Sequence, residues 1–219
     1  EIPKDSKKHS LFAGSLWIGG LSQGSNLKVA AMTYRQSGND FWPGPLDVTN
    51  ASVESQVCAQ YDRHFVITRK EVEEFKTSYE AQGSGVTVPA AIEGWPAFDR
   101  YGNANITQKL APFYDADQND EYNPSGGDYP GYSFKNEMGD CKTQAQLFGD
   151  RTLWWVFNDK GNVHTESDGS QVGLEIHAQA FAFSTNDEIN NMTFYQYQIF
   201  NRSSDKLDSC YLGMWVDPD

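Results

Sequence analysis

Apolar and polar residues alternate along the last third of the chain in the manner of β-strands. In residues 172–184 the apolar positions of the alternation are Leu174, Ile176, Ala178, Ala180 and Ala182. The polar positions between them are Glu175, His177 and Gln179. Residues 193–201 alternate again, and residues 210–216 form a third apolar run after a turn-rich link. Strands joined in this way predict an antiparallel meander of three consecutive strands.

The first half of the chain gives two further local signals. Apolar runs at residues 10–18 and 27–34 flank turn-forming residues, which predicts a β-hairpin. Thr68 and Glu71 have the spacing of a helix capping box. Apolar residues then recur at helical spacing until Gly83, so we expect one short helix between Thr68 and Gly83.

These patterns predict an all-β, mainly antiparallel fold, like a β-sandwich or jelly roll, with one short helix. We expect a single β-rich domain over residues 1–219. Residues 82–149 are dense in Pro, Gly, Asn and Asp, which indicates a loop-rich insertion. An irregular stretch of this length inside a compact domain needs something to hold it. The chain starts without Met and stops directly after an apolar run, so we also expect it to be truncated at both ends.

Charge and composition narrow the classes of partner. Acidic residues outnumber basic ones 30 to 17, giving a formal net charge of −13, so a nucleic-acid partner is not expected. The sequence has no apolar stretch long enough to span a membrane. Cys58, Cys141 and Cys210 show no metal-binding spacing, and the sequence leaves open whether they form one disulfide or remain thiols.

The segment DADQNDEYNPSGGD, residues 115–128, has the spacing of a calcium-binding loop. Oxygen-bearing side chains occupy its first, third and fifth positions, and the seventh position would add a backbone carbonyl oxygen. The predicted metal ligands are Asp115, Asp117, Asn119, Glu121 and Asp128. The cofactor we expect is Ca²⁺, which requires six to eight oxygen ligands.

Two positions of this loop depart from the usual calcium pattern. Asp120 occupies the sixth position, where Gly is usual, and must adopt a left-handed backbone conformation. Gly126 occupies the twelfth, so Asp128 or water must supply the closing oxygen. We expect a dissociation constant of about 10⁻⁴–10⁻³ M and a structural role, in which the ion fastens the loop-rich insertion.

The sequence contains no complete catalytic motif. His164 with Glu166, and Glu175 with His177, place an acid and an imidazole on one face of a strand, and we interpret both pairs as an ordinary polar, solvent-facing surface. Asp217 and Asp219 are interpreted as two acids in a terminal segment. The six tryptophans keep carbohydrate binding open, because sugars stack on exposed aromatic rings.

Six stretches together resemble the amino-terminal region of large surface proteins that Bacteroidota export through the type IX secretion system. They cover most of the chain: HSLFAGSLWIGGL (9–21), LKVAAMTYRQSGNDFWPGPLD (27–47), CAQYDRHFVITRKEVEEF (58–75), LAPFYDADQNDEYNPSGGDYP (110–130), LWWVFNDKGNVHTE (153–166) and GLEIHAQAFAFSTNDEINNMTFYQYQIFNRS (173–203). Such proteins often have Gly and Asp where this loop has Asp120 and Gly126.

The resemblance implies a longer precursor with a signal peptide and a carboxy-terminal sorting domain. It implies an extracellular or outer-surface location, and a role in adhesion or gliding motility in some members. The expected partners are surface glycans, other surface proteins and, as export cargo, the secretion translocon. We therefore expect a non-catalytic calcium-binding module with a structural or adhesive role. The alternatives are a carbohydrate-binding module or part of a secreted glycoside hydrolase, and a hydrolase whose catalytic residues lie beyond Asp219.

Overall fold

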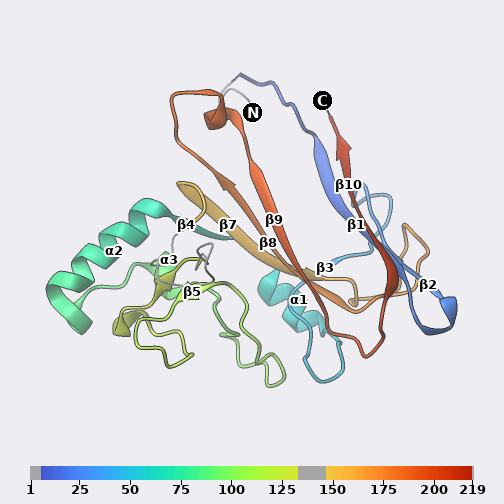
Figure 1. Cartoon of the computed structure of the whole chain (residues 1–219), viewed down its shortest axis with the longest axis horizontal. Coiled ribbons are helices and arrows are strands. Elements are labelled where there is room, and N and C mark those ends of the chain that lie inside the picture. The colour runs from blue at the N-terminus through green and yellow to red at the C-terminus, as the bar shows by residue number, and fades with distance from the viewer. Residues whose placement is uncertain (1–5, 133–146, 219) are drawn as a thin grey trace. The chain divides into compact units, whose positions relative to one another are not determined.

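The computed structural model describes residues 6–132 and 147–218. Most strands are antiparallel and the helices are short, so the predicted all-β, sandwich-like fold class is confirmed (Figure 1). The chain divides into two compact units. The first comprises Glu1–Asp62, Val156–Ile176 and Gln198–Asp219, and the second comprises Arg63–Trp155 and His177–Tyr197.

The first unit contains a three-stranded sheet in the order β10-β1-β2. Strands β1 (Ala13–Leu21) and β2 (Leu27–Ala30) form the predicted hairpin, with antiparallel pairs from Ile18 opposite Ala30 to Leu21 opposite Leu27. The 3₁₀ turn η1 (Gln23–Ser25) lies between them. Leu16 and Ile18 of β1 are buried in the core of this unit.

The predicted three-stranded meander is wrong at its third strand. Strand β10 (Asp208–Asp217) pairs with β1, from Ala13 opposite Asp217 to Gly19 opposite Tyr211 (Figure 1). Alternation within a segment identifies a strand but not its partner, because any strand with the same period satisfies the pattern. The link before β10 is held to the start of β8 by a hydrogen bond from the Arg202 N–H to the Gly173 carbonyl.

A second sheet has the order β3-β7-β8-β9, and β4 also pairs with β7. Its strands are β3 (Trp42–Pro43), β4 (Phe65–Thr68), β7 (Arg151–Asn158), β8 (Leu174–Ala182) and β9 (Phe194–Asn201). Strands β7, β8 and β9 each have residues in both units. Strand β8 lies between β7 and β9, and its residues 174–180 are all buried.

The predicted helix is confirmed as α2 (Arg69–Gln82). The Thr68 hydroxyl accepts a hydrogen bond from the Glu71 N–H, and the Glu71 carboxylate accepts one from the Thr68 N–H, which completes the capping box. Val72 and Phe75 are its buried residues. Two short helices were not predicted, α1 (Ser55–Tyr61) and α3 (Ala90–Glu93), because so few turns give little periodic signal.

The segment predicted to be loop-rich contains only short elements among its described residues. They are η2 (Gly83–Gly85), α3, β5 (Phe113–Tyr114), η3 (Pro124–Gly126) and β6 (Tyr129–Pro130). A further 3₁₀ turn, η4 (Glu188–Asn191), precedes β9. Across the described chain, every helix is too short or too polar to cross a membrane.

Candidate metal centre

A minimal hairpin brings the two ends of the acidic loop together. Strands β5 and β6 pair antiparallel, with Phe113 opposite Pro130 and Tyr114 opposite Tyr129. Asp115 directly follows β5 and Asp128 directly precedes β6, so continuing this register places the two residues opposite each other. The residues between them form the loop. This pairing explains why an acid at the fourteenth position can close a site that begins at the first.

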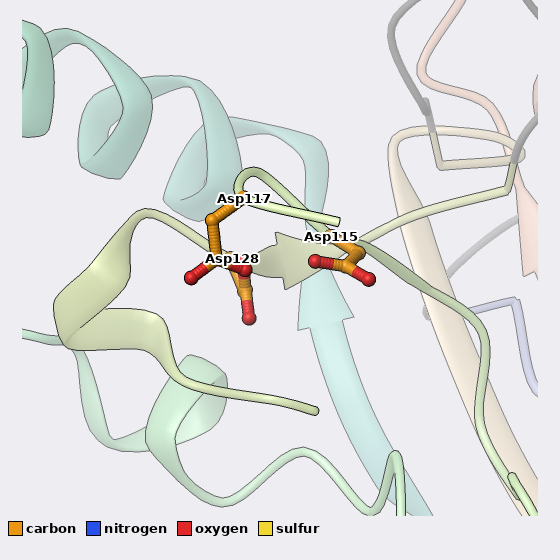
Figure 2. A group of neighbouring side chains, drawn as sticks. All are labelled: Asp115, Asp117 and Asp128. Carbon is orange, nitrogen blue, oxygen red and sulfur yellow. The ribbon is translucent and has the colours of Figure 1, made fainter. Parts of the chain in front are cut away.

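Three carboxylates meet at the base of this loop. One oxygen from each of Asp115, Asp117 and Asp128 lies within 4.8 Å of the others (Figure 2). Two oxygens that bind the same Ca²⁺ at about 2.3–2.6 Å can be at most about 5 Å apart. The spacing is therefore compatible with three ligands to one ion. Asp128 is 2% exposed, whereas Asp117 is open to solvent, so an ion here would have protein on one side and water on the other.

Backbone N–H groups hold two of these carboxylates in place. Asp128 accepts hydrogen bonds from the N–H of Ala116 at 2.8 Å and from the N–H of Asn123 at 2.7 Å. Asp115 accepts hydrogen bonds from the N–H of Asn119 at 3.2 Å and from the N–H of Asp120 at 2.8 Å. The bonds to Asp115 fold the loop around this first acid, so the position of the Asp115 carboxylate does not depend on side-chain packing alone.

The loop turns through left-handed backbone conformations at two residues other than glycine. Gln118 has φ of +60° and Asp120 has φ of +66°. The structure thus gives Asp120 the conformation expected of the sixth loop position, which an aspartate tolerates better than most residues. The Asp120 carboxylate forms an ion pair with the Lys109 ammonium at 2.7 Å, so it is engaged away from the three carboxylates.

The two innermost acids experience opposite electrostatic effects. Burial raises the pKa of Asp115, but the N–H groups of Asp120, Asn119 and Gln118 outweigh it and hold the pKa below its ordinary value. Burial is also the largest effect at Asp128, and the negative charges of Asp115 and Asp117 add to it, so the pKa of Asp128 is raised despite two N–H bonds. A cation placed among the three carboxylates would relieve this repulsion.

Aromatic contacts fix the hairpin beneath the site. The rings of Tyr114 and Tyr129 stack with centroids 4.8 Å apart, and Phe113 meets Tyr122 edge to face at 5.2 Å. The Tyr122 hydroxyl donates a hydrogen bond to the Ile92 carbonyl at 2.6 Å, which ties the loop to helix α3. The Lys76 ammonium of helix α2 lies 5.3 Å from the centre of the Tyr129 ring.

The structure gathers three of the five predicted ligands. Asn119 lies beside them, because its side-chain amide donates a hydrogen bond to Asp117 at 2.9 Å, and its oxygen accepts one from the Glu121 N–H at 2.7 Å. The Glu121 carboxylate is exposed and is not among the three. The atom that Glu121 is predicted to supply to the ion is its backbone carbonyl oxygen, and this contact stays a prediction. Sequence reasoning missed Lys109 because its partner Asp120 lies eleven positions away.

The acid–imidazole pairs that the sequence analysis assigned to solvent are largely buried. Glu175, His177 and His164 are exposed by 0%, 4% and 1%, so the expectation of a polar solvent face is wrong for them. Glu175 accepts hydrogen bonds from Arg202 and from the Leu46 N–H, and His177 meets the Trp154 ring edge to face. Residues 174–180 of β8 are all buried, so Glu175 and His177 on its polar face are buried too and require partners. His164 lies outside any strand, in the link between β7 and β8.

The remaining residues named in the sequence analysis are the two terminal aspartates, the cysteines and the tryptophans. The Asp217 carboxylate accepts a hydrogen bond from the Tyr34 hydroxyl, and Asp219 lies outside the described residues. Cys58 and Cys210 are free thiols, and Cys141 also lies outside the described residues. Among the tryptophans, Trp95 and Trp154 are buried in the core of the second unit.

Comparison with known proteins yields no match: no protein-family model, no curated protein and no solved structure is similar to this chain.

Proposed function

We propose that this chain is a non-catalytic, calcium-binding module whose ion fastens the segment between helix α3 and strand β6. The observation that carries the proposal is the convergence of Asp115, Asp117 and Asp128, whose oxygens lie within 4.8 Å of one another. Hard oxygen ligands without His or Cys favour calcium over transition metals. Burial is the main cause of the raised pKa of Asp128, and the negative charges of Asp115 and Asp117 add to it. A divalent cation would offset this repulsion.

The role we propose for the ion is structural. The loop already encloses its first acid through backbone hydrogen bonds, and its neighbours contact α2 and α3. Binding of one ion would link residue 115 to residue 128 and so close the loop. The buried acid–imidazole pairs support a non-catalytic role, because Glu175 forms an ion pair and both ring nitrogens of His164 contact backbone carbonyls.

Export through the type IX system and a surface or secreted location are part of the same proposal. They are supported by the six quoted sequence stretches. Detection of the full-length protein on the surface of intact cells, and its loss from the surface when the secretion system is inactivated, would test this part. Retention of the mature protein in the cytoplasm would contradict it. The calcium part is independent of this result.

Thermal unfolding tests the calcium site directly. A ligand present at 100 times its dissociation constant stabilises the folded state by about 2.7 kcal/mol. For a chain of this size the corresponding rise in Tm is about 5–11 °C. We expect calcium to give a rise of this order and excess chelator to reverse it. Magnesium should give a smaller rise, because it requires shorter and more regular coordination.

Two variants separate a specific site from a general effect of salt on an acidic protein. Asp128→Asn should abolish most of the calcium-dependent rise, since it removes the charge of the buried ligand. Glu121→Gln is the matched control: it removes one charge from the same loop but keeps the backbone carbonyl oxygen, and it should retain the response. If the wild-type Tm does not respond to calcium, or if both variants respond equally, the proposed site is wrong.

A further inference from the structure

Strand β10 lies at an open edge of the three-stranded sheet in the first unit. It pairs on one side with β1, and no other strand of the described chain pairs with its second side. At the opposite edge, Lys28 of β2 forms a parallel bridge with Ser170, and the Val29 N–H donates to the Ser170 carbonyl at 3.3 Å. The β10 edge is left open to a further strand, because the outward N–H and C=O groups of an edge strand have no ladder partner.

The sequence of β10 lacks the usual protection of an edge strand. Natural edges are blunted by Lys, by Pro, by bulges or by short length. Strand β10 is 10 residues long and contains no Lys, Arg or Pro. Its one shift in register lies at its beginning, so residues 211–217 form a regular ladder with β1. This regular stretch is therefore open to strand addition along its whole length.

Apolar side chains of β10 continue the buried face of the sheet into solvent. Met214 lies opposite Leu16 of β1, and Leu212 lies opposite Ile18, so these residues share one face of the sheet. Val216 follows on the same face at the period of a strand. Leu16 and Ile18 are only 7% and 5% exposed, whereas Leu212, Met214 and Val216 are 63%, 54% and 50% exposed. A partner that covers this row must therefore supply apolar side chains as well as a strand.

We propose that this partner is a second copy of the chain, and that the two β10 strands pair antiparallel about a two-fold axis at Met214. Strand β10 of a second copy supplies an open edge, an apolar row of the same period, and acids only at the strand ends. A two-fold axis perpendicular to the sheet keeps the same face of both copies on the same side. Leu212 then lies opposite Val216, and Met214 lies opposite its own copy. On the other face, Gly213 lies opposite Trp215.

This register suits the side chains along the strand. All residues of the regular stretch 211–217 gain a partner, and Gly213 leaves room for the Trp215 indole. Like charges directly opposite each other destabilise a ladder. Asp217 lies opposite Tyr211 instead of another acid, and Asp208 lies beyond the paired stretch. The pairing uses both open edges and leaves the bridged β2 strands outermost, so the assembly stops at two copies. This dimer does not depend on the calcium site.

Cysteine cross-linking tests the position of the two-fold axis. Opposite Cα atoms of an antiparallel pair are about 4.5–5.5 Å apart, within the range of about 4.4–6.8 Å that a disulfide spans. In a chain whose three native cysteines are replaced by Ser, Met214→Cys should form a covalent dimer on mild oxidation. Leu27→Cys is the matched control: it is also exposed, at 63%, but lies on the β2 edge, so it should stay monomeric. No cross-linking of Met214→Cys, or equal cross-linking of both variants, would overturn the proposed axis.

Analytical ultracentrifugation of the 219-residue chain tests the dimer itself. The wild-type mass should rise from 24.6 kDa to twice that value with increasing protein concentration. Added NaCl should favour the dimer, because each chain has a formal charge of −13 and salt screens the repulsion between copies. Met214→Lys should remain monomeric, since it places two ammonium groups opposite each other, whereas Leu27→Lys should still dimerise. A wild-type protein that is monomeric at every concentration, or that forms species larger than a dimer, would contradict the proposal.

Discussion

Replacing Arg202 with Met should destabilise the first unit by leaving a buried carboxylate without its counter-charge. Glu175 is fully buried, and its carboxylate accepts a hydrogen bond from the Arg202 guanidinium at 2.8 Å. It accepts a second from the Leu46 N–H at 2.7 Å. Methionine preserves most of the aliphatic volume of arginine but removes the charge and the donors.

The size of the loss follows from the burial of the two partners. Removing one member of a buried ion pair costs about 3–5 kcal/mol. The Arg202 side chain is 21% exposed, and Glu175 still accepts the hydrogen bond from the Leu46 N–H in the variant. We therefore expect the unfolding free energy to fall by about 3 kcal/mol, near the lower limit of this range. Glu175→Gln should offset part of the loss, because a neutral amide does not need the cation. The two substitutions should therefore be coupled by about 1–3 kcal/mol.

Urea unfolding of the four proteins of this cycle measures the coupling. Lys206→Met is the matched control, since Lys206 lies in the same link but pairs with Asp208 at the surface, where both side chains are largely exposed. Exposed ion pairs often contribute nothing measurable, so this variant should unfold like the wild type. If Arg202→Met and Lys206→Met change stability equally, the Glu175–Arg202 pair is not desolvated and the reasoning is refuted.

Three further predictions concern the cap, a glycine and the pH response. Thr68→Ala should lower the unfolding free energy by about 1 kcal/mol, because it removes the acceptor for the Glu71 N–H; a change no larger than that of Thr77→Ala, a hydroxyl within the same helix, would contradict it. Gly149→Ala should cost about 2 kcal/mol or more in urea unfolding, since Gly149 has φ of +68° and an added Cβ would lie 2.5 Å from the carbonyl oxygen of Ala182. A near-neutral effect would show that this backbone can relax. Asp40 has a lowered pKa, so its contribution is present above about pH 3.9, the unfolded value, and is lost as the pH falls toward the folded value. Acid unfolding of Asp40→Asn should therefore be less pH-dependent than that of wild type, and equal slopes would refute this.

Local signals in the sequence were sufficient to predict several helices and strands correctly, among them α2 and the β1–β2 hairpin. The Thr68 capping box and its helical spacing predict α2, and the structure confirms both. The apolar runs around a turn predict the β1–β2 hairpin, which also forms. These elements depend on contacts between residues close in the chain, so short-range patterns contain the necessary information. Helices α1 and α3 were missed because they are too short to produce such a pattern.

In the candidate metal site, sequence spacing predicts the proximity of some ligands but not of others. The acids at positions 115 and 117 are close in the sequence, so their proximity follows from the loop itself. The position of Asp128 depends on the pairing of β5 with β6, which sets it opposite Asp115. The role of Glu121 would require its backbone carbonyl to face the ion, and side-chain identity says little about carbonyl direction.

The sequence by itself determined the β1–β2 hairpin, the strands of the last third, where the long helix begins and ends, and which acids are close enough to share a loop. Only the tertiary structure decided that β10 pairs with β1, that both faces of β8 are covered, and that Glu175 and His164 are buried with partners. The physical reason is that periodicity records the local geometry of the backbone. Strand partners and burial instead depend on contacts between residues far apart in the chain.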